Sequence, residues 1–479
     1  GFEIYSFDLI FHGESTGPEI KVYKLIGMKK IYFCFFGVLL ICTSPTFAQE
    51  AQEAQEMTIE QCLEFAIGNN ESIQISELSI KDAEAEIRGI VALGLPQATL
   101  RGGVNYNYEV QTSLVDASNF DQTLAPGTLT EIQFGLPYDG NLSMGVSQLI
   151  FDGVYFVGVQ ASKTFRELST KENERTKIEV VAAVTKAYYN VLINQAQLYL
   201  LSQNFSRLDT LLRETTQMYQ NGFAEQIDVD RIKVSYNNIK VNLETQIQLS
   251  GISQKLLKFQ MGMPLDAPIA LTTSLMDVNL EIPELTVDFD YNDRIEYSLL
   301  ETNRSLALLD KKNYLSKYLP KIYGNFNYGY NNATGLSSDL FGNDWYNFGT
   351  VGATISIPLF EGFAKKTKIQ QALIKIEQLD YQKSFLQKNI DIEIAQQKIS
   401  LESNLKILEV QRQNQELAAN IFRITKIKFQ EGIGSNLELT NADNEYKAAQ
   451  TNYLATLYKS ILSKIDLLKA TGTLYNTKS

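Results

Sequence analysis

Four segments of the chain alternate apolar and polar residues. They are about 97–110, 132–151, 321–331 and 346–360. In the first segment, Leu100 and Val104 fall on one side of an extended chain, whereas Thr99 and Asn105 fall on the other. This period of two predicts β-strands that each have one apolar and one polar face.

The fourth segment changes phase near its start. Tyr346 and Phe348 have the opposite parity from Val351 and Ile355, so one extended strand would put them on the polar face. A bulge adds one residue and would return these aromatic side chains to the apolar face. We therefore expect either a bulge near Gly349 or a strand that begins later.

Each pair of strands is followed by a long stretch that has no proline and almost no glycine. These stretches, about 154–220 and 363–430, each predict one very long helix. In the first, apolar residues such as Val181, Val184 and Tyr188 follow a three-four spacing, and a second apolar line runs beside them. Two apolar lines suit a helix with neighbours on both sides, as in a cylinder of helices. An ordinary coiled-coil stalk is the alternative.

Both long helices end at a glycine, Gly222 or Gly432. Glycine readily adopts the left-handed conformation that ends a helix. Return helices are then expected at about 226–261 and 436–470. Each long helix and its return helix would form an antiparallel hairpin.

Similar segments recur in the two halves of the chain. The matching pairs are 149–153 with 358–362 and 219–222 with 429–432. Because the spacing within each half is nearly the same, we infer a tandem duplication, with repeats at 49–261 and 291–475. The connector between them, about 262–290, is expected to be non-helical because it holds three prolines, Pro264, Pro268 and Pro283.

Charge and rare residues exclude several classes of protein. The net charge is −12, and a phosphate-binding surface needs concentrated Lys and Arg, so we expect no nucleic-acid partner. The only histidine is His12, and the cysteines are Cys34, Cys42 and Cys62. Without the leader described next, the chain has no histidine and one cysteine. We therefore expect neither an enzyme nor a metal or other cofactor.

The N-terminal region has the features of an export signal. Met28 is followed by two lysines, an apolar run and a small-residue site ending at Ala48, so residues 28–48 are expected to be a signal peptide. Residues 1–27 are then upstream sequence, and lipidation at Cys42 is the alternative processing. After Ala48 the chain has no uncharged apolar stretch of about 18 residues, so apolar helices are not expected to span a membrane.

The strands fit a membrane barrel with apolar side chains outside and polar side chains inside. Aromatic residues that suit the membrane interface are Tyr106, Tyr108, Tyr328, Tyr330 and Trp345. Four strands cannot close a barrel, and an open sheet edge is not tolerated in lipid. Several copies would therefore have to share one barrel. The alternative is a small soluble sheet with one buried face.

The order and spacing of these elements resemble the TolC-like outer membrane efflux proteins. The closest local match is the segment 429–439, followed by 452–454 and 471–474. The resemblance implies an α plus transmembrane β protein with two αββαα-type halves. It also implies a homotrimer whose 12-stranded outer-membrane barrel continues as a periplasmic helical barrel. Implied partners are a periplasmic adaptor, an inner-membrane transporter (RND, ABC or similar) and outer-membrane lipid.

The resemblance also assigns roles at the two helical turns. The turns that would contact the adaptor contain Asn221, Gly222, Phe223, Ala224, Gly432, Ile433, Gly434 and Ser435. Acidic residues just beyond the turn would narrow the entrance, and the matching positions are Asp228, Glu438 and Asn441. Asn441 lacks the charge found in the family. The alternative for Asp228 and Glu438 is that they are acids favoured at helix starts.

We expect a passive exit duct of a tripartite efflux or type I secretion system, in the outer membrane with a large periplasmic part. A periplasmic adaptor or coiled-coil structural protein of an export system is the alternative, although it would need neither the strands nor the duplication. The sequence names neither the cargo nor the class of pump.

Overall fold

The computed structural model describes residues 55–120, 123, 125–273, 275, 278, 280–281, 289–342 and 344–475. The expected upstream segment 1–27, the signal peptide 28–48 and Cys42 lie outside the described residues, as does part of the expected connector.

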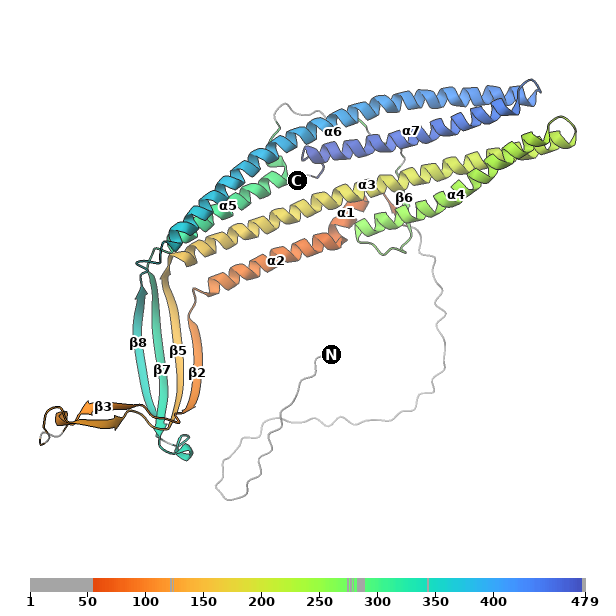
Figure 1. The fold of residues 1–479 in the computed structure, drawn as a ribbon. Coiled ribbons are helices and arrows are strands. Elements are labelled where there is room, and N and C mark those ends of the chain that lie inside the picture. Colours follow the sequence, from red (N-terminus) through yellow and green to blue (C-terminus); the bar gives the residue numbers. More distant parts are fainter. Residues whose placement is uncertain are drawn as a thin grey trace, which may run out of the picture. The chain divides into compact units, whose positions relative to one another are not determined.

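Four strands form one antiparallel sheet in the order β2-β5-β7-β8 (Figure 1). Their bounds are β2 Gln97–Tyr106, β5 Tyr138–Asp152, β7 Lys321–Thr334 and β8 Tyr346–Ser356. The middle strands β5 and β7 have partners on both sides, whereas β2 and β8 each have one free edge. All four lie within or close to the segments that alternate in the sequence.

The register aligns side chains of one kind across the sheet. Leu100 of β2 pairs with Met144 of β5, which pairs with Tyr328 of β7, so these side chains share the apolar face. On the opposite face Asn327 of β7 pairs with Thr350 of β8. The alternation along each strand therefore produces one apolar face and one polar face for the whole sheet.

The expected bulge near Gly349, or a late strand start, is wrong. Strand β8 begins at Tyr346 and pairs with β7 without a shift, so Tyr346 and Phe348 lie on the polar face. The register shift falls instead in β5, between Leu149 and Phe151. Ladder hydrogen bonds over the whole length of β8 outweigh the placement of two aromatic side chains.

A second hairpin lies beyond the end of the sheet that is distant from the helices (Figure 1). It consists of β3 Thr112–Asp116 and β4 Leu129–Gln133. The strand expected at 132–151 is thus divided, because Gly135 has a left-handed φ of 126° and Pro137 cannot donate to a ladder. The strand expected to reach residue 110 ends at Tyr106.

Seven α-helices are described. They are α1 Ile59–Asn69, α2 Glu71–Ala92, α3 Gly153–Gln220, α4 Gln226–Met261, α5 Ile295–Ser316, α6 Ala364–Gln430 and α7 Asn436–Ala470. The two long helices and their return helices match the expected segments closely. For α1, α2 and α5, the sequence analysis gave no bounds. The element order α2-β2-β5-α3-α4 is followed by the same order in α5-β7-β8-α6-α7.

The helices lie side by side in a consistent lateral order (Figure 1). Helix α3 contacts α2 and α4 on one side and α5 and α7 on the other, and both α5 and α7 contact α6. The helical layer therefore has α2 and α4 at one lateral edge and α6 at the other. These edges correspond to the free strands β2 and β8, which adjoin α2 and α6 in the chain.

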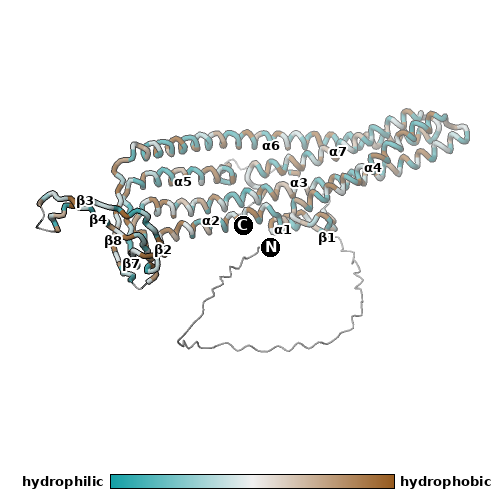
Figure 2. The backbone as a smooth tube through the Cα atoms, turned by 60° about the horizontal axis from the view of Figure 1, so that its bottom comes forward, coloured by the Kyte–Doolittle hydropathy of each residue, from teal (hydrophilic) through white to brown (hydrophobic). Residues whose placement is uncertain are grey.

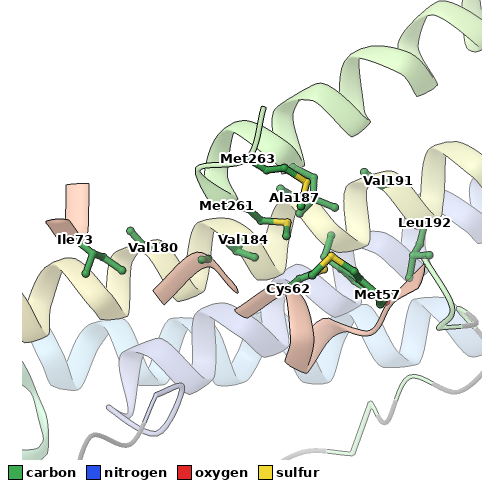
Figure 3. Packing of buried hydrophobic residues seen from close by; sticks show 13 residues of the cluster. Met57, Cys62, Ile73, Val180, Val184, Ala187, Val191, Leu192, Met261 and Met263 are labelled. Atoms are coloured by element: carbon green, nitrogen blue, oxygen red, sulfur yellow. The ribbon is translucent and has the colours of Figure 1, made fainter. Parts of the chain in front are cut away.

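A buried cluster joins α1 to the middle of α3, as Figure 3 shows. Cys62, Val184 and Met261 are completely buried in it, and two short strands, β1 Gln55–Met57 and β6 Ile269–Leu271, pair beside them. Tyr188 donates a hydrogen bond to Thr273 Oγ1 over 2.7 Å. This cluster fixes the described part of the connector against α3.

Hydrophilic and hydrophobic residues are mixed along the long helices α3 and α6 (Figure 2). Among the described residues, no helix combines the length and the apolar composition that crossing a membrane requires.

Candidate functional site

The two helical hairpins end in turns of the same geometry. Gly222 and Gly432 have left-handed φ angles of 81° and 76°. The amide of the next residue then reaches back into the last helical turn, from Phe223 to the Met218 carbonyl over 2.8 Å and from Ile433 to the Lys428 carbonyl over 3.0 Å. This is the Schellman arrangement, which satisfies the free carbonyls of a helix end.

The turns expose apolar side chains. In a Schellman turn the residue after the glycine commonly packs against the helix, but Phe223 and Ile433 are each 79% exposed. Most of the other turn residues are exposed as well, namely Asn221, Gly222, Gly432 and Ser435, whereas Ala224 and Gly434 are partly buried. Each hairpin turn therefore exposes one bulky apolar residue.

Asp228 makes structural contacts within its own hairpin and with the other hairpin. Its carboxylate accepts a hydrogen bond from the Glu225 amide over 3.2 Å and so caps the start of α4. It also accepts one from Asn436 Nδ2 over 3.0 Å, which ties α4 to α7. The expected interpretation of Asp228 as a helix-start acid thus has direct geometric support.

Glu438 and Asn441 lie on the first turns of α7, where both side chains are exposed. The Glu438 amide donates to Ser435 Oγ over 3.2 Å, so Ser435, not Glu438, supplies the side-chain cap of this helix. No ion pair of the Glu438 carboxylate is found within the described part of the chain. The structure therefore brings Asp228 to Asn436 and leaves Glu438 available to another molecule.

Buried polar contacts that the sequence pattern did not predict join the two hairpins. Three polar residues of α7, Asn436, Asp443 and Gln450, are buried and spaced seven apart. The strongest contact is a two-nitrogen bond from Arg207 of α3 to Asp443 Oδ1, over 2.7 and 3.1 Å. The seven-residue spacing of polar positions was the available signal.

Aromatic rings enclose this ion pair. The Arg207 guanidinium lies 4.9 Å from the Phe422 ring centroid and 5.4 Å from that of Tyr446. Asp443, which also contacts Lys447, keeps only 4% of its side chain exposed. Burial and the aromatic faces hold the pair in one geometry, so it links α3 to α7 firmly.

The expected interface aromatics lie at different heights on the sheet. Tyr106 stacks on Tyr138 at the outer end, with ring centroids 4.8 Å apart. Tyr108 lies just beyond that strand and is strongly exposed. Tyr328 and Tyr330 are neighbours on the apolar face, with hydroxyl oxygens 3.4 Å apart.

Trp345 covers the apolar face at the start of β5. A Cβ placed on Gly140 would approach its ring to 2.9 Å, so only a glycine leaves room for it. Asn332 fixes the preceding loop by donating to the Leu340 carbonyl over 2.9 Å.

The lateral edges of the helical layer carry a second apolar line. On α6 the buried residues Ala372, Leu379 and Ile390 are each followed, two positions on, by an exposed apolar residue. Two positions are about 200° around a helix, so the exposed line faces away from the chain's own core. It contains Ile374, Tyr381, Phe385, Ile392, Ile399, Leu417 and Ile424.

Helix α4 has the same arrangement at the opposite edge. Buried Ile232 and Ile239 are followed two positions on by exposed Val234 and Val241. The line continues at Ile227, Ile252 and Phe259. Both outer helices therefore present heptad-like apolar lines that nothing in this chain covers among its described residues.

The described residues offer few groups suited to metal binding or nucleophilic catalysis. They contain no group of three or more acidic, Cys or His side chains placed to hold a metal ion. Burial raises the pKa of Cys62 to about 12, so its thiol stays protonated and is a poor nucleophile.

Comparison with known proteins assigns the fold. The model of the outer membrane efflux protein family matches residues 63–246 and 316–473. Toluene efflux pump outer membrane protein TtgC of Pseudomonas putida is 22% identical over 428 residues, covering 86% of this chain and 82% of that protein. Outer membrane protein TolC of Vibrio cholerae is 20% identical over 354 residues, covering 70% and 77%.

Solved structures of outer membrane proteins have a similar fold. The outer membrane protein VceC of Vibrio cholerae superposes with a TM-score of 0.65 at 16% identity, covering 86% of this chain and 96% of that one. The CmeC outer membrane channel of Campylobacter jejuni gives 0.69 at 14% identity, covering 88% and 87%. With a family model that matches most of both halves and the sheet-and-hairpin architecture described above, the chain belongs to the outer membrane efflux protein family.

Proposed function

We propose that this chain is the outer-membrane exit duct of a tripartite efflux or type I secretion system, working as a homotrimer. As an outer membrane efflux protein it is a passive channel and not an enzyme, with a helical tunnel that extends into the periplasm. The periplasmic adaptor considered as an alternative is not favoured, because the family match includes both strand pairs, both helical turns and most of both hairpins.

The main support for a trimer is that both lateral edges of the chain leave groups without partners. Strands β2 and β8 each leave one row of backbone groups without strand partners, and α4 and α6 expose apolar lines on the same two sides. An open sheet edge is not tolerated in lipid. Pairing β8 of one copy with β2 of the next would satisfy both kinds of edge at once.

Three copies with four strands each would close a barrel of 12 strands, an even number within the range of such barrels. The repeated element order α-β-β-α-α supports an origin by duplication, with repeats at 49–261 and 291–475. We further propose that residues 28–48 are removed as a signal peptide during export.

The polar face of the sheet would line the water-filled passage. It is hollowed by a cavity of about 310 Å³ that is lined mainly by polar residues, among them Gln97, Thr99, Arg101, Ser143, Ser147 and Asn325. The apolar face, with Leu100, Met144 and Phe326 largely exposed, would contact lipid. This division is the arrangement of membrane barrels.

The exposed turn residues Phe223 and Ile433 would be contacts for a periplasmic adaptor, which connects the duct to an inner-membrane transporter. Three copies of Glu438 around one axis would form an acidic ring that attracts cations at the entrance. Asn441, one turn further along α7, adds no charge, and Asp228 is engaged in capping. The relative named as a toluene efflux pump component suggests small apolar cargo, without identifying it.

A pair of substitutions tests the proposal. Ile392→Glu places a charge in the outward line of α6 and should prevent the trimer, seen as loss of the heat-resistant oligomer on gels. Ile433→Glu places the same charge at a turn and should leave the trimer intact while reducing adaptor-dependent export. A wild-type protein that stays monomeric in detergent would refute the duct.

A further inference from the structure

The junction between β8 and α6 has a strained backbone. Phe363, with φ of 65°, is the one non-glycine residue with a left-handed backbone among those described, and it follows Gly362, with φ of 58°. This left-handed backbone conformation is energetically unfavourable for an aromatic residue. It persists only where other interactions compensate for the energetic cost. No side-chain hydrogen bond caps the start of α6, so a cap does not supply this compensation.

The strain directs Phe363 outward beside Phe360. The two rings meet edge to face, with centroids 5.5 Å apart. Phe360 is nevertheless 75% exposed and Phe363 69% exposed, and the neighbouring Leu359 is more exposed still. A cavity of about 250 Å³ lies among these residues and Tyr318. The junction thus displays an apolar patch that the described residues of this chain leave exposed.

A second apolar patch lies at the other lateral edge, where α2 passes into β2. Leu93 and Leu95 are both more than half exposed there. Tyr155 occupies the inner side of this turn, since it donates a hydrogen bond to the Val91 carbonyl over 3.2 Å and blocks any side chain at Gly94. The two leucines consequently face away from the chain.

We propose that Phe360 and Phe363 of one copy dock on Leu93 and Leu95 of the next copy, forming an apolar latch at the level where barrel and helices meet. This inference rests on the ring assembly proposed above. Both patches adjoin the helix-proximal ends of the free strands, β8 ending at Ser356 and β2 beginning at Gln97. Pairing those strands between copies brings the patches to the same interface.

A second copy fits better than lipid as the occupant. Lipid would contact the broad apolar face of the sheet, whereas these patches lie in line with its two edges. The two edges run antiparallel, because β2 leads away from the helices and β8 leads back to them, so they suit each other as ladder partners. Burying the rings against leucines would compensate for the strained backbone.

Cysteine cross-linking tests the contact directly. In a Cys62→Ala background, Leu95→Cys combined with Phe363→Cys should give disulfide-linked dimers and trimers on mild oxidation. The matched control combines Phe223→Cys with Phe363→Cys, which places one thiol at a distant exposed turn, and should remain at background.

A second variant separates fold from assembly. Phe363→Gly removes the ring and relieves the backbone strain, so the helical circular dichroism should be unchanged while the temperature at which the oligomer dissociates falls. Phe223→Gly should shift neither quantity.

An unchanged dissociation temperature for Phe363→Gly, or a heat-resistant wild-type oligomer without cross-linking of the 95/363 pair, would overturn the latch alone. Reduced recovery in the outer membrane with an intact oligomer would mean that the patch faces lipid, and would also overturn it. A monomeric wild type would instead refute the proposed function.

Discussion

The two halves of the chain share one element order but use corresponding residues differently. Where β5 passes into α3, Asp152 is buried, accepts a hydrogen bond from the Val154 amide over 2.8 Å and pairs with Lys321. At the matching place in the second half, Glu361 is exposed, and the ion pair found for it among the described residues is with Lys365, one turn on. Helix α6 there begins after two left-handed residues.

Position in the sheet explains the difference. The first junction continues a central strand and is enclosed by its own chain, so a polar group there needs a partner and finds one. The second continues an edge strand and can leave apolar groups exposed. The helical turns repeat the contrast, since Asp228 is engaged by Glu225 and Asn436 whereas Glu438 is not. At these two places the first half engages its acidic side chain within the chain, whereas the second half leaves its acidic side chain exposed.

The largest expected effect is at the contact between the halves. Arg207→Ala leaves the buried Asp443 carboxylate without its main partner and should lower the free energy of unfolding by about 3 kcal/mol. Arg412→Ala, which breaks an exposed pair with Glu409 within one helix, should cost less than about 1 kcal/mol. Thermal unfolding followed by circular dichroism in detergent measures both, and equal losses would show that the halves are not joined here.

The two junctions can be compared directly. Asp152→Ala removes a buried helix cap and should cost about 1–2 kcal/mol of unfolding free energy. Glu361→Ala removes an exposed carboxylate from Lys365, which is buried but keeps its contact with the Tyr318 ring, and should cost about 1 kcal/mol or less. Urea unfolding of the two variants measures both losses of unfolding free energy. A larger loss for Glu361→Ala would contradict the difference between the two junctions.

At the turns the contrast concerns conduction. Glu438→Gln should lower the cation conductance of the reconstituted pore and weaken its preference for cations, because a ring of charges that attracts cations is removed. Asp228→Asn should change conductance less and instead loosen the start of α4. Single-channel recording in planar bilayers distinguishes them, and an unchanged conductance for Glu438→Gln discards the gate assignment.

The smallest effect is expected at the outer hairpin, which only the first half contains. Hydrogen bonds from the Ser118 hydroxyl and amide and from the Gly127 amide lower the pKa of Asp116 below its usual 3.8. A lowered pKa stabilises the folded hairpin above about pH 3.8 and loses that contribution as the pH falls toward the lowered value. Amide exchange at Gly127 should therefore accelerate in acid. Asp116→Asn should abolish that pH dependence.

Much of the fold was predictable because its signals are local. Alternation located the four strands, and Gly222 and Gly432 located the ends of the long helices, since both patterns act through the nearest backbone. The hairpin β3–β4 was missed because its short strands alternate weakly. The phase of Tyr346 was misjudged because the β7–β8 ladder, a contact between distant segments, sets it.

The candidate site, too, could be predicted only where its signals are local. The turn residues could be named from the glycine motif, but whether an acid there is free depends on neighbours far along the chain. Asp228 is engaged because Asn436 lies beside it, and Asp443 is buried because Arg207 reaches it. Neither contact can be predicted from a local sequence pattern.

The sequence by itself determined the elements of this protein, the apolar and polar faces of its strands and the turns that fold its long helices back, because each depends on residues within a few positions. Only the tertiary structure decided which strands are edges, which acids are engaged and which apolar lines remain uncovered. Those properties depend on the lateral order β2-β5-β7-β8 and on the packing of α3 between its neighbours, which bring together residues from opposite halves of the chain.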